Sequence, residues 1–349
     1  MKTAAWRVSA ILSVTAGLLM IAGGCNKSNS STPTADNAPP ATQPGGGSAT
    51  PPAPGGPITI AVIPKGTTHE YWVSVHKGAQ AAADALGVTI TYKGPLKESD
   101  ANGQVNIVEQ FTSDNISGIV LAPLSDTALL EPVQAATAKK IPVVVIDSAL
   151  GGTAGTDYVS YISTNNHLGG VMAGDQMTKI LGGKGKLVML RYAPYSASTN
   201  EREAGFLESV KKSPGFELLS VDQYGGATES EAQQKSENML DVLKQADGIF
   251  CPNESATLGM LKALQENNLA GKVKFVGFDA TGPEVDALKA AQIDALVSQN
   301  PYVMGYMGVQ TCVAAIRGTK VDLIQDSGVK LVTPDNVNTP DMVKFLAGG

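Results

Sequence analysis

The sequence predicts an α/β fold made of two similar, doubly wound parallel-sheet lobes. Short apolar runs typical of buried strands alternate with helical patterns along residues 58–349, and this alternation indicates parallel sheets with crossover helices. Four strand-like runs are followed by four more in the same order and at similar spacing, which predicts two lobes. The eight runs are ITIAVIP (58–64), GVTITYKG (87–94), SGIVLAP (117–123), IPVVVID (141–147), KLVMLRY (186–192), FELLSVDQY (216–224), DGIFCPN (247–253) and VKFVGFD (273–279).

The first 24 residues have the pattern of an export signal. They begin with basic Lys2 and Arg7, continue with an apolar run over 8–22, and end with small residues before Cys25. This segment resembles the bacterial lipoprotein signal, in which the cysteine is lipidated and becomes the mature amino terminus. We therefore expect lipid attachment at Cys25. An ordinary cleaved signal peptide with an incidental cysteine is the alternative.

Residues 25–57 predict a flexible tether rich in Pro, Gly, Ser and Thr. This segment contains almost no large apolar side chain, so it is not able to bury a core. Its length suits a domain that is anchored at a membrane and reaches away from it. No later apolar stretch is long enough to cross a bilayer.

Composition and motifs argue against several classes of protein. The net charge of −6 argues against a nucleic-acid partner. No phosphate-binding loop follows a predicted strand, no serine lies in a nucleophile elbow, and His69 and His76 are a poor pair for a metal. We expect Cys251 and Cys312 to be buried thiols, with a disulfide between them as the alternative. The sequence therefore predicts a protein that is not an enzyme and uses neither a cofactor nor a metal.

Two aspartates occupy matching places in the two halves. Asp147 ends the fourth predicted strand of the first half, and Asp279 ends the fourth predicted strand of the second. Both then lie at the carboxyl edge of a parallel sheet, where loops carry ligand groups. Either aspartate alone is explained by a helix cap or a turn. Their matched placement favours a shared role in a cleft between the lobes.

An aromatic pair, Tyr71 and Trp72, lies where the first predicted strand gives way to a helix. In a chain with only 5% aromatic residues, the pair is expected to form one wall of a binding site. Core packing under the first helix is the alternative, and we expect it to apply in part to one of the two rings. Aromatic faces pack against the C–H face of a sugar ring, while carboxylates, amides and guanidinium groups bind hydroxyls. The residues that suit a neutral polyhydroxylated ligand are Tyr71, Trp72, Asp147, Arg202, Asn253, Asp279 and Gln299.

With these residues in place, the chain resembles the ribose- and galactose-type periplasmic sugar-binding proteins that feed ABC transporters. This fold is shared with the sensor domains of lac-repressor-type regulators. The resemblance covers nearly all of 58–345. It rests on YWVSVHKGAQAAADALG (71–87), TNNHLGGVMAGDQ (164–176), NEREAGF (200–206), FCPNESATLGMLKALQ (250–265), VGFDATGPE (276–284) and ALVSQNPYVMGYMG (295–308).

The resemblance implies roles for particular residues. It makes Tyr71 and Trp72 the ring-stacking pair, Asp147 the first-lobe hydroxyl acceptor, Arg202, Asn253 and Asp279 the second-lobe contacts, and Gln299 a contact at a hinge crossing. Ribose binders of this family usually have arginine after the first-lobe aspartate, where this chain has Ser148. They have asparagine at the positions of His69 and Ala122. His69 is expected either to donate to a ligand hydroxyl or to orient its loop. Loss of an arginine that recognises hydroxyls leaves room or polarity for a ligand other than ribose.

The resemblance also implies a type I periplasmic binding protein with two interrupted lobes. The first lobe is expected at 58–164 plus 300–328 and the second at 165–299 plus 329–349, with hinges near Thr164, Gln299 and Ser327. We expect a monomer on the periplasmic or cell-surface face that closes on its ligand and docks on an ABC permease. The alternative is a tethered sensor for a chemoreceptor or histidine kinase. Aldopentoses, aldohexoses, sugar alcohols and a small furanose signal all fit the predicted site.

Overall fold

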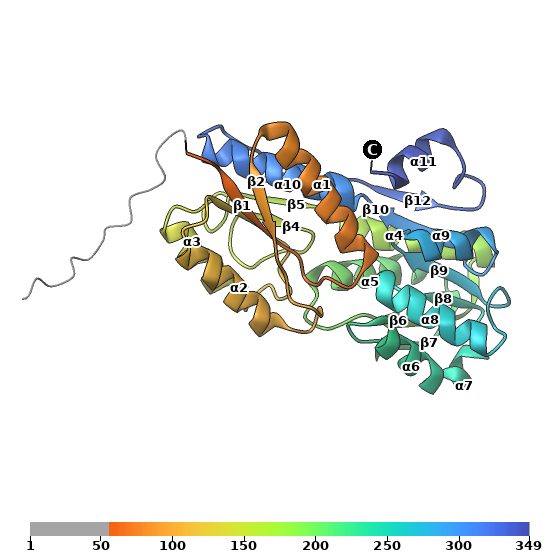
Figure 1. Cartoon of the computed structure of the whole chain (residues 1–349). Coiled ribbons are helices and arrows are strands. Elements are labelled where there is room, and N and C mark those ends of the chain that lie inside the picture. Colours follow the sequence, from red (N-terminus) through yellow and green to blue (C-terminus); the bar gives the residue numbers. More distant parts are fainter. Residues whose placement is uncertain (1–55, 349) are drawn as a thin grey trace, which may run out of the picture. The chain divides into compact units, whose positions relative to one another are not determined.

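Two six-stranded sheets form the framework of the chain (Figure 1). The computed structural model describes residues 56–348. The first sheet has the order β11-β5-β4-β3-β1-β2, and the second has the order β12-β10-β9-β8-β6-β7. In the first sheet the strands are β1 (Thr59–Ile63), β2 (Thr89–Tyr92), β3 (Gly118–Leu121), β4 (Val143–Ile146), β5 (Ser160–Ser163) and β11 (Ile324–Asp326). In the second they are β6 (Lys184–Arg191), β7 (Gly215–Tyr224), β8 (Gly248–Phe250), β9 (Lys274–Phe278), β10 (Ala295–Gln299) and β12 (Val329–Val332).

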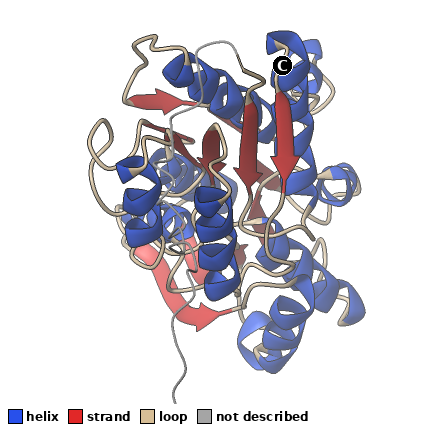
Figure 2. Ribbon diagram, turned by 60° about the vertical axis from the view of Figure 1, so that its left-hand side comes forward, coloured by secondary structure: helices blue, strands red, loops and turns tan. Residues whose placement is uncertain are grey.

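Helices cover both faces of each sheet (Figure 2). On the first sheet, α1 (Glu70–Leu86) and α10 (Pro301–Ile316) pack on one face, and α2 (Ala101–Ser113) and α3 (Leu130–Ala138) on the other. Each sheet with its helices is called a lobe below. The second lobe has α4 (Asn166–Leu181) and α5 (Ala197–Val210) on one face; on the other lie α6 (Glu229–Asn238), α7 (Leu240–Leu243), α8 (Glu254–Glu266), α9 (Gly282–Lys289) and α11 (Pro340–Leu346).

The predicted two-lobed α/β fold is confirmed. Each of the eight predicted runs contains a strand, and β3 and β4 are buried along their whole length because helices cover both faces of the sheet. Four strands were not predicted as strands, namely β5, β10, β11 and β12. The sheets also depart from a purely parallel arrangement, since β12 pairs antiparallel with β10 at one edge.

The same close helix contact occurs in both lobes. A Cβ on Gly78 of α1 would lie 1.9 Å from the carbonyl oxygen of Tyr302 in α10, and one on Gly170 of α4 would lie 2.0 Å from that of Arg202 in α5. Only glycine allows the helix backbones to approach this closely. These contacts position α1, which carries the aromatic pair, and α5, which carries Arg202.

The chain passes between the lobes at three adjacent places. Thr164 follows β5, Gln299 ends β10, and Ser327 lies between β11 and β12. The Thr164 hydroxyl donates to Gln299 Oε1 at 3.0 Å and lies 3.4 Å from Ser327 Oγ. A small polar cluster therefore joins the three crossings.

The structure also bears on the predictions for the cysteines and for membrane-spanning segments. Cys251 and Cys312 are free and fully buried thiols, one in each lobe, as the sequence predicts. None of the helices within 56–348 is both long and apolar enough to cross a membrane. The predicted signal, Cys25 and nearly all of the predicted tether lie outside the described residues.

Candidate functional site

The two aspartates at the strand ends adopt the same unusual backbone conformation. Asp147 has φ 66° and Asp279 has φ 78°, in the left-handed region that only a few per cent of non-glycine residues occupy. Each amide still continues the sheet, since Asp147 N donates to Ile162 O at 3.0 Å and Asp279 N to Val297 O at 2.8 Å. Backbone strain of this kind clusters at functional sites. The same strain at equivalent positions of both lobes indicates a functional site at the carboxyl edges of the two sheets.

A cavity between the lobes brings the predicted residues together. Its free volume is about 30 Å³, room for one or two water molecules, so a larger ligand requires the lobes or the lining side chains to move. All eight predicted ligand contacts line this cavity: His69, Tyr71, Trp72, Asp147, Arg202, Asn253, Asp279 and Gln299.

The aromatic pair forms part of the cavity wall and part of the core. The rings of Tyr71 and Trp72 meet edge to face with centroids 4.8 Å apart, and both pack in the hydrophobic core under α1. Their polar ends are fixed, because Tyr71 OH donates to Asp147 Oδ1 at 3.0 Å and Trp72 Nε1 donates to Glu98 Oε1 at 2.6 Å. Core packing therefore applies to both rings, and not to one alone.

Lys65 is a charged residue of the cavity that the sequence reasoning missed. Its ammonium group lies 2.5 Å from Asp147 Oδ2 and donates to Ser148 Oγ at 2.6 Å and to Ser198 Oγ at 3.2 Å. The ammonium group thus has one ionic partner and two hydroxyl acceptors on the protein. Lys65, which follows β1, therefore places a cation beside the first-lobe aspartate and bonds Ser148, the residue after that aspartate.

Glu98 is a second missed residue and organises the other end of the cavity. It lies in the loop after β2 and accepts from His69 Nδ1 at 2.7 Å and, across the cleft, from Tyr192 OH at 2.7 Å. Burial by itself would raise the pKa of Glu98, but the His69 imidazole, the Lys65 ammonium and the Trp72 hydrogen bond lower it to about 2. Burial by itself would lower the pKa of His69, but Glu98 in particular raises it to about 9.

His69 is therefore a cation that presents a free donor. Its Nε2 is buried and has no hydrogen-bond partner among residues 56–348. A buried donor without a partner costs free energy that a ligand acceptor would recover. Of the two readings of His69, donation to a ligand and orientation of the loop, the bond from Nδ1 to Glu98 serves the second and leaves Nε2 available for the first.

The second-lobe wall is built around Arg202. Its Nε donates to Asn166 Oδ1 at 2.8 Å and its Nη1 to the carbonyl oxygen of Pro252 at 2.9 Å, while the guanidinium lies 4.0 Å from the centroid of the Phe278 ring. These contacts hold the planar guanidinium group of Arg202 in place beside the cavity. Asn253 is the N-cap of α8, accepting from Ala256 N at 3.3 Å.

Asp279 is held by neutral donors. Gln299 Nε2 donates to its Oδ1 at 2.8 Å, and the amide of Glu254 donates to its Oδ2 at 2.9 Å. Burial raises the pKa of Asp279, although Arg202 and the Gln299 hydrogen bond act in the opposite direction. Because Gln299 also accepts from Thr164, Asp279 is linked directly to the three crossings.

Glu254 is a third missed residue and bridges the lobes. Its two carboxylate oxygens each accept at 3.0 Å, one from Glu70 N and the other from Tyr71 N. Burial raises its pKa to about 7. Lys65 and Glu254 share one sequence signal, since each directly follows a predicted strand run, whereas Glu98 lies farther along the loop after β2 and carries no such signal.

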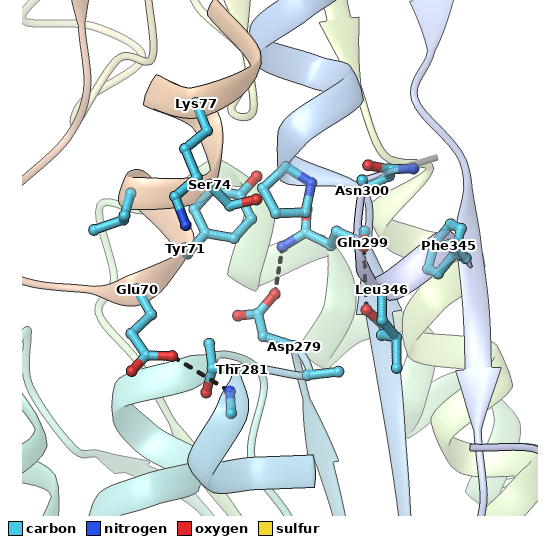
Figure 3. Close-up of a pocket in the computed structure, with 16 residues that line it drawn as sticks. Glu70, Tyr71, Ser74, Lys77, Asp279, Thr281, Gln299, Asn300, Phe345 and Leu346 are labelled. Atoms are coloured by element: carbon cyan, nitrogen blue, oxygen red, sulfur yellow. Dashed lines mark hydrogen bonds between the residues drawn. The ribbon is translucent and has the colours of Figure 1, made fainter. Parts of the chain in front are cut away.

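A second, larger cavity of about 510 Å³ lies beside the first (Figure 3). Tyr71, Asp279 and Gln299 line both cavities and form the wall between them. Glu70 stands at its edge and accepts from Gly282 N at 3.3 Å, another bond between the lobes. The lining also includes Phe345 near the carboxyl terminus.

Comparisons with known proteins agree on one family. A family model described as a periplasmic binding protein domain matches residues 60–320. The ribose import binding protein of Haemophilus influenzae is 29% identical over 264 residues, which cover 76% of this chain and 87% of that protein. A carbohydrate transporter solute binding protein from Agrobacterium radiobacter, solved with D-arabinose, is similar with TM-score 0.79 and 33% identity, covering 83% of this chain and 99% of the other. A solute binding protein from Agrobacterium vitis, solved with D-fucose, has TM-score 0.79 and 32% identity, with coverage of 82% and 98%.

Proposed function

This chain belongs to the periplasmic binding protein family, and from that premise we propose that it captures a sugar or related polyol between its lobes and delivers it to an ABC importer. It is a binding protein and not an enzyme, in keeping with its family. The observation that carries the proposal is the matched pair of strained aspartates, Asp147 and Asp279, which face one cavity from the two lobes.

The cavity offers the chemistry that a sugar requires. Tyr71 and Trp72 supply apolar ring surface, Asp147 and Asp279 accept from hydroxyls, and the remaining polar contacts come from His69, Arg202, Asn253 and Gln299. His69 donates through its free Nε2. One relative is named a ribose import binding protein and another was solved in complex with D-arabinose, which supports an unphosphorylated monosaccharide as the ligand class.

The basic group beside the first aspartate sets this site apart from the ribose type. Lys65 approaches Asp147 from β1, while Ser148 occupies the position of the usual arginine. A lysine is a compact point charge, whereas arginine presents a planar fork that binds two acceptors at once. We propose that the ligand has a hydroxyl pattern different from that of ribose at this end of the site.

Closure of the lobes is the proposed mechanism. The lobes are expected to be 58–164 plus 300–328 and 165–299 plus 329–349, with Thr164, Gln299 and Ser327 as hinge residues. The ligand-free lobes exchange between open and closed forms; a ligand enters the open form and closure buries it, after which the closed form docks on the permease. Small-angle scattering on the protein with and without a tight ligand tests this step, because identical dimensions would contradict it.

The amino-terminal part completes the proposal. Residues 1–24 are proposed as a lipoprotein signal, Cys25 as the lipid attachment site and 25–57 as a tether that holds a monomeric binding domain on the periplasmic or cell-surface face of a membrane. Mass spectrometry of the protein extracted from membranes tests this, since Cys25→Ser should abolish lipid attachment and release the protein.

A thermal-shift screen tests the proposed ligand class. Pentoses, hexoses, polyols and cyclitols are tested against the protein and against Asp279→Ala, with Asp286→Ala on the exposed face of α9 as the matched control. A ligand that binds only the folded state stabilises it by about 2.7 kcal/mol at a hundredfold excess over its dissociation constant. One hit that is retained in the control and lost in Asp279→Ala supports the proposal. A flat panel contradicts it.

A further inference from the structure

Helix amino termini on both sides of the cleft are capped from the opposite lobe. The amides of Glu70 and Tyr71, in the first turn of α1, donate to Glu254 of the second lobe. The amide of Ser198, in the first turn of α5 in the second lobe, donates to Ser148 Oγ of the first lobe at 3.3 Å. First-turn amides have no partner inside their own helix, so each of these bonds satisfies a group that the helix itself leaves free.

The two helices lack the local caps that other helices of the chain have. Neither His69, at the N-cap of α1, nor Ser196, at the N-cap of α5, makes a side-chain capping bond in the described structure. His69 is engaged by Glu98 instead. Five other helices, α2, α4, α6, α8 and α10, are capped by their own N-cap side chains, Asp100, Asn165, Thr228, Asn253 and Asn300.

Glu254 makes the strongest of these contacts. Both of its oxygens are used, at 3.0 Å each, its side chain is buried, and a carboxylate at a helix amino terminus interacts favourably with the helix dipole. Its position is fixed because its own amide donates to Asp279 Oδ2 at 2.9 Å. The capping carboxylate is thus attached to the second-lobe aspartate, and Tyr71, whose amide it accepts, bonds the first-lobe aspartate Asp147.

We propose that Glu254 is a positioning residue for closure, which stabilises the closed lobes by capping α1 across the cleft. The lobes cap each other only when they are closed, because separation leaves the amides of Glu70, Tyr71 and Ser198 to water. A side chain that contributes to the closed state alone raises the population of that state, and with it the apparent affinity for ligand. This last consequence rests on the proposed function; the closure role itself does not.

Residue-resolved hydrogen exchange on the ligand-free protein tests the closure role. The variants are Glu254→Ala, which removes the cap, and Glu254→Asp, which keeps the charge but shortens the side chain by one methylene. Glu266→Ala is the matched control, since it removes an exposed carboxylate from the other end of the same helix. The decisive reporter is the amide of Ser198, because it is bonded across the cleft to Ser148 and not to Glu254.

If the proposal holds, both Glu254 variants speed exchange at Ser198 on the order of tenfold or more, together with exchange at Glu70 and Tyr71, while Glu266→Ala and the core strands behave as in the unmodified protein. Faster exchange at Glu70 and Tyr71 alone would show a local cap and overturn the proposal. Unprotected Ser198 in the unmodified ligand-free protein would also overturn it. No sugar is present, so failure of the sugar screen and failure of this test are separate results.

Discussion

The two lobes present equivalent aspartates in the same strained conformation, yet they hold them by different chemistry. Asp147 is paired with the Lys65 ammonium at 2.5 Å, whereas Asp279 is held by the amide of Gln299 and the backbone amide of Glu254. A buried ion pair depends strongly on both partners, while a carboxylate with neutral donors depends on each of them only modestly. The internal repeat therefore preserves the backbone of the site, and each lobe adds its own electrostatics.

Of the changes considered, removal of the Lys65 ammonium should lower the free energy of unfolding most. In Lys65→Met, Asp147 remains buried without its cation, and we expect the free energy of unfolding to fall by about 3–5 kcal/mol. Urea denaturation measures this change. The exposed Lys97→Met in the neighbouring loop is the control and should change stability by less than about 0.5 kcal/mol. A similar small loss in Lys65→Met would show that the ion pair contributes little.

The His69–Glu98 pair predicts a loss of stability in alkaline solution. The pKa of His69 is raised from 6.5 to about 9 in the folded protein, with Glu98 as the main favourable partner and Glu254 and Asp279 as weaker ones. Its contribution is therefore complete below pH 6.5 and is lost as the pH rises through about 9. We expect His69→Gln to remove on the order of 3 kcal/mol from the difference in unfolding free energy between pH 6 and pH 10.

Denaturation curves at several pH values measure that difference. His167→Gln is the matched control, because the imidazole of His167 is partly exposed and pairs only with the exposed carboxylate of Glu208. The same alkaline loss in His69→Gln as in the unmodified protein would assign the pH dependence to other groups.

The second aspartate should tolerate change better than the first-lobe pair. Asp279→Asn keeps the shape of the side chain but loses one acceptor, so one of its two donors, Gln299 or the amide of Glu254, is left without a partner. We expect a loss of about 1–2 kcal/mol in the free energy of unfolding. Calorimetric unfolding measures it. A loss as large as that of Lys65→Met would remove the contrast between the lobes.

Loss of the indole nitrogen of Trp72 should have the smallest effect on the free energy of unfolding. Trp72→Phe keeps one aromatic ring in the core but removes the pyrrole part of the indole and, with it, the donor to Glu98, which keeps His69 and Tyr192 as partners. We expect about 1 kcal/mol of destabilisation by urea denaturation. Phe111→Leu, in the core on the opposite face of the first sheet, serves as a packing control with a cost of similar size. No change at all in Trp72→Phe would show that Glu98 does not need this donor.

Sequence patterns predicted the framework and the strand-end residues because both follow from local rules. Asp147 and Asp279 end apolar runs, and the carboxyl edges of parallel strands meet at one place. The edge strand β11 was missed because its three residues, Ile324–Asp326, carry no apolar alternation and are mostly exposed. Short edge strands depend on pairing with their neighbours and not on their own sequence.

The hydrogen bonds across the cleft could not be predicted from the sequence, for a different reason. Glu98 meets Tyr192, and Glu254 meets the start of α1, only because two lobes distant in sequence come together. Lys65 illustrates the same limit, since the sequence shows Ser148 in place of the expected arginine but not that Lys65, which follows β1, lies beside it.

The central claim is that one sugar is shared by the two aspartates. Isothermal titration of the purified protein with a panel of aldopentoses, aldohexoses and polyols tests it most directly, repeated with Asp147→Asn and Asp279→Asn. We predict saturable binding of one molecule per chain for one sugar or polyol, with affinity reduced at least tenfold in each variant, about 1.4 kcal/mol or more. Binding that survives both substitutions, or no binding across the panel by a folded protein, would contradict the account.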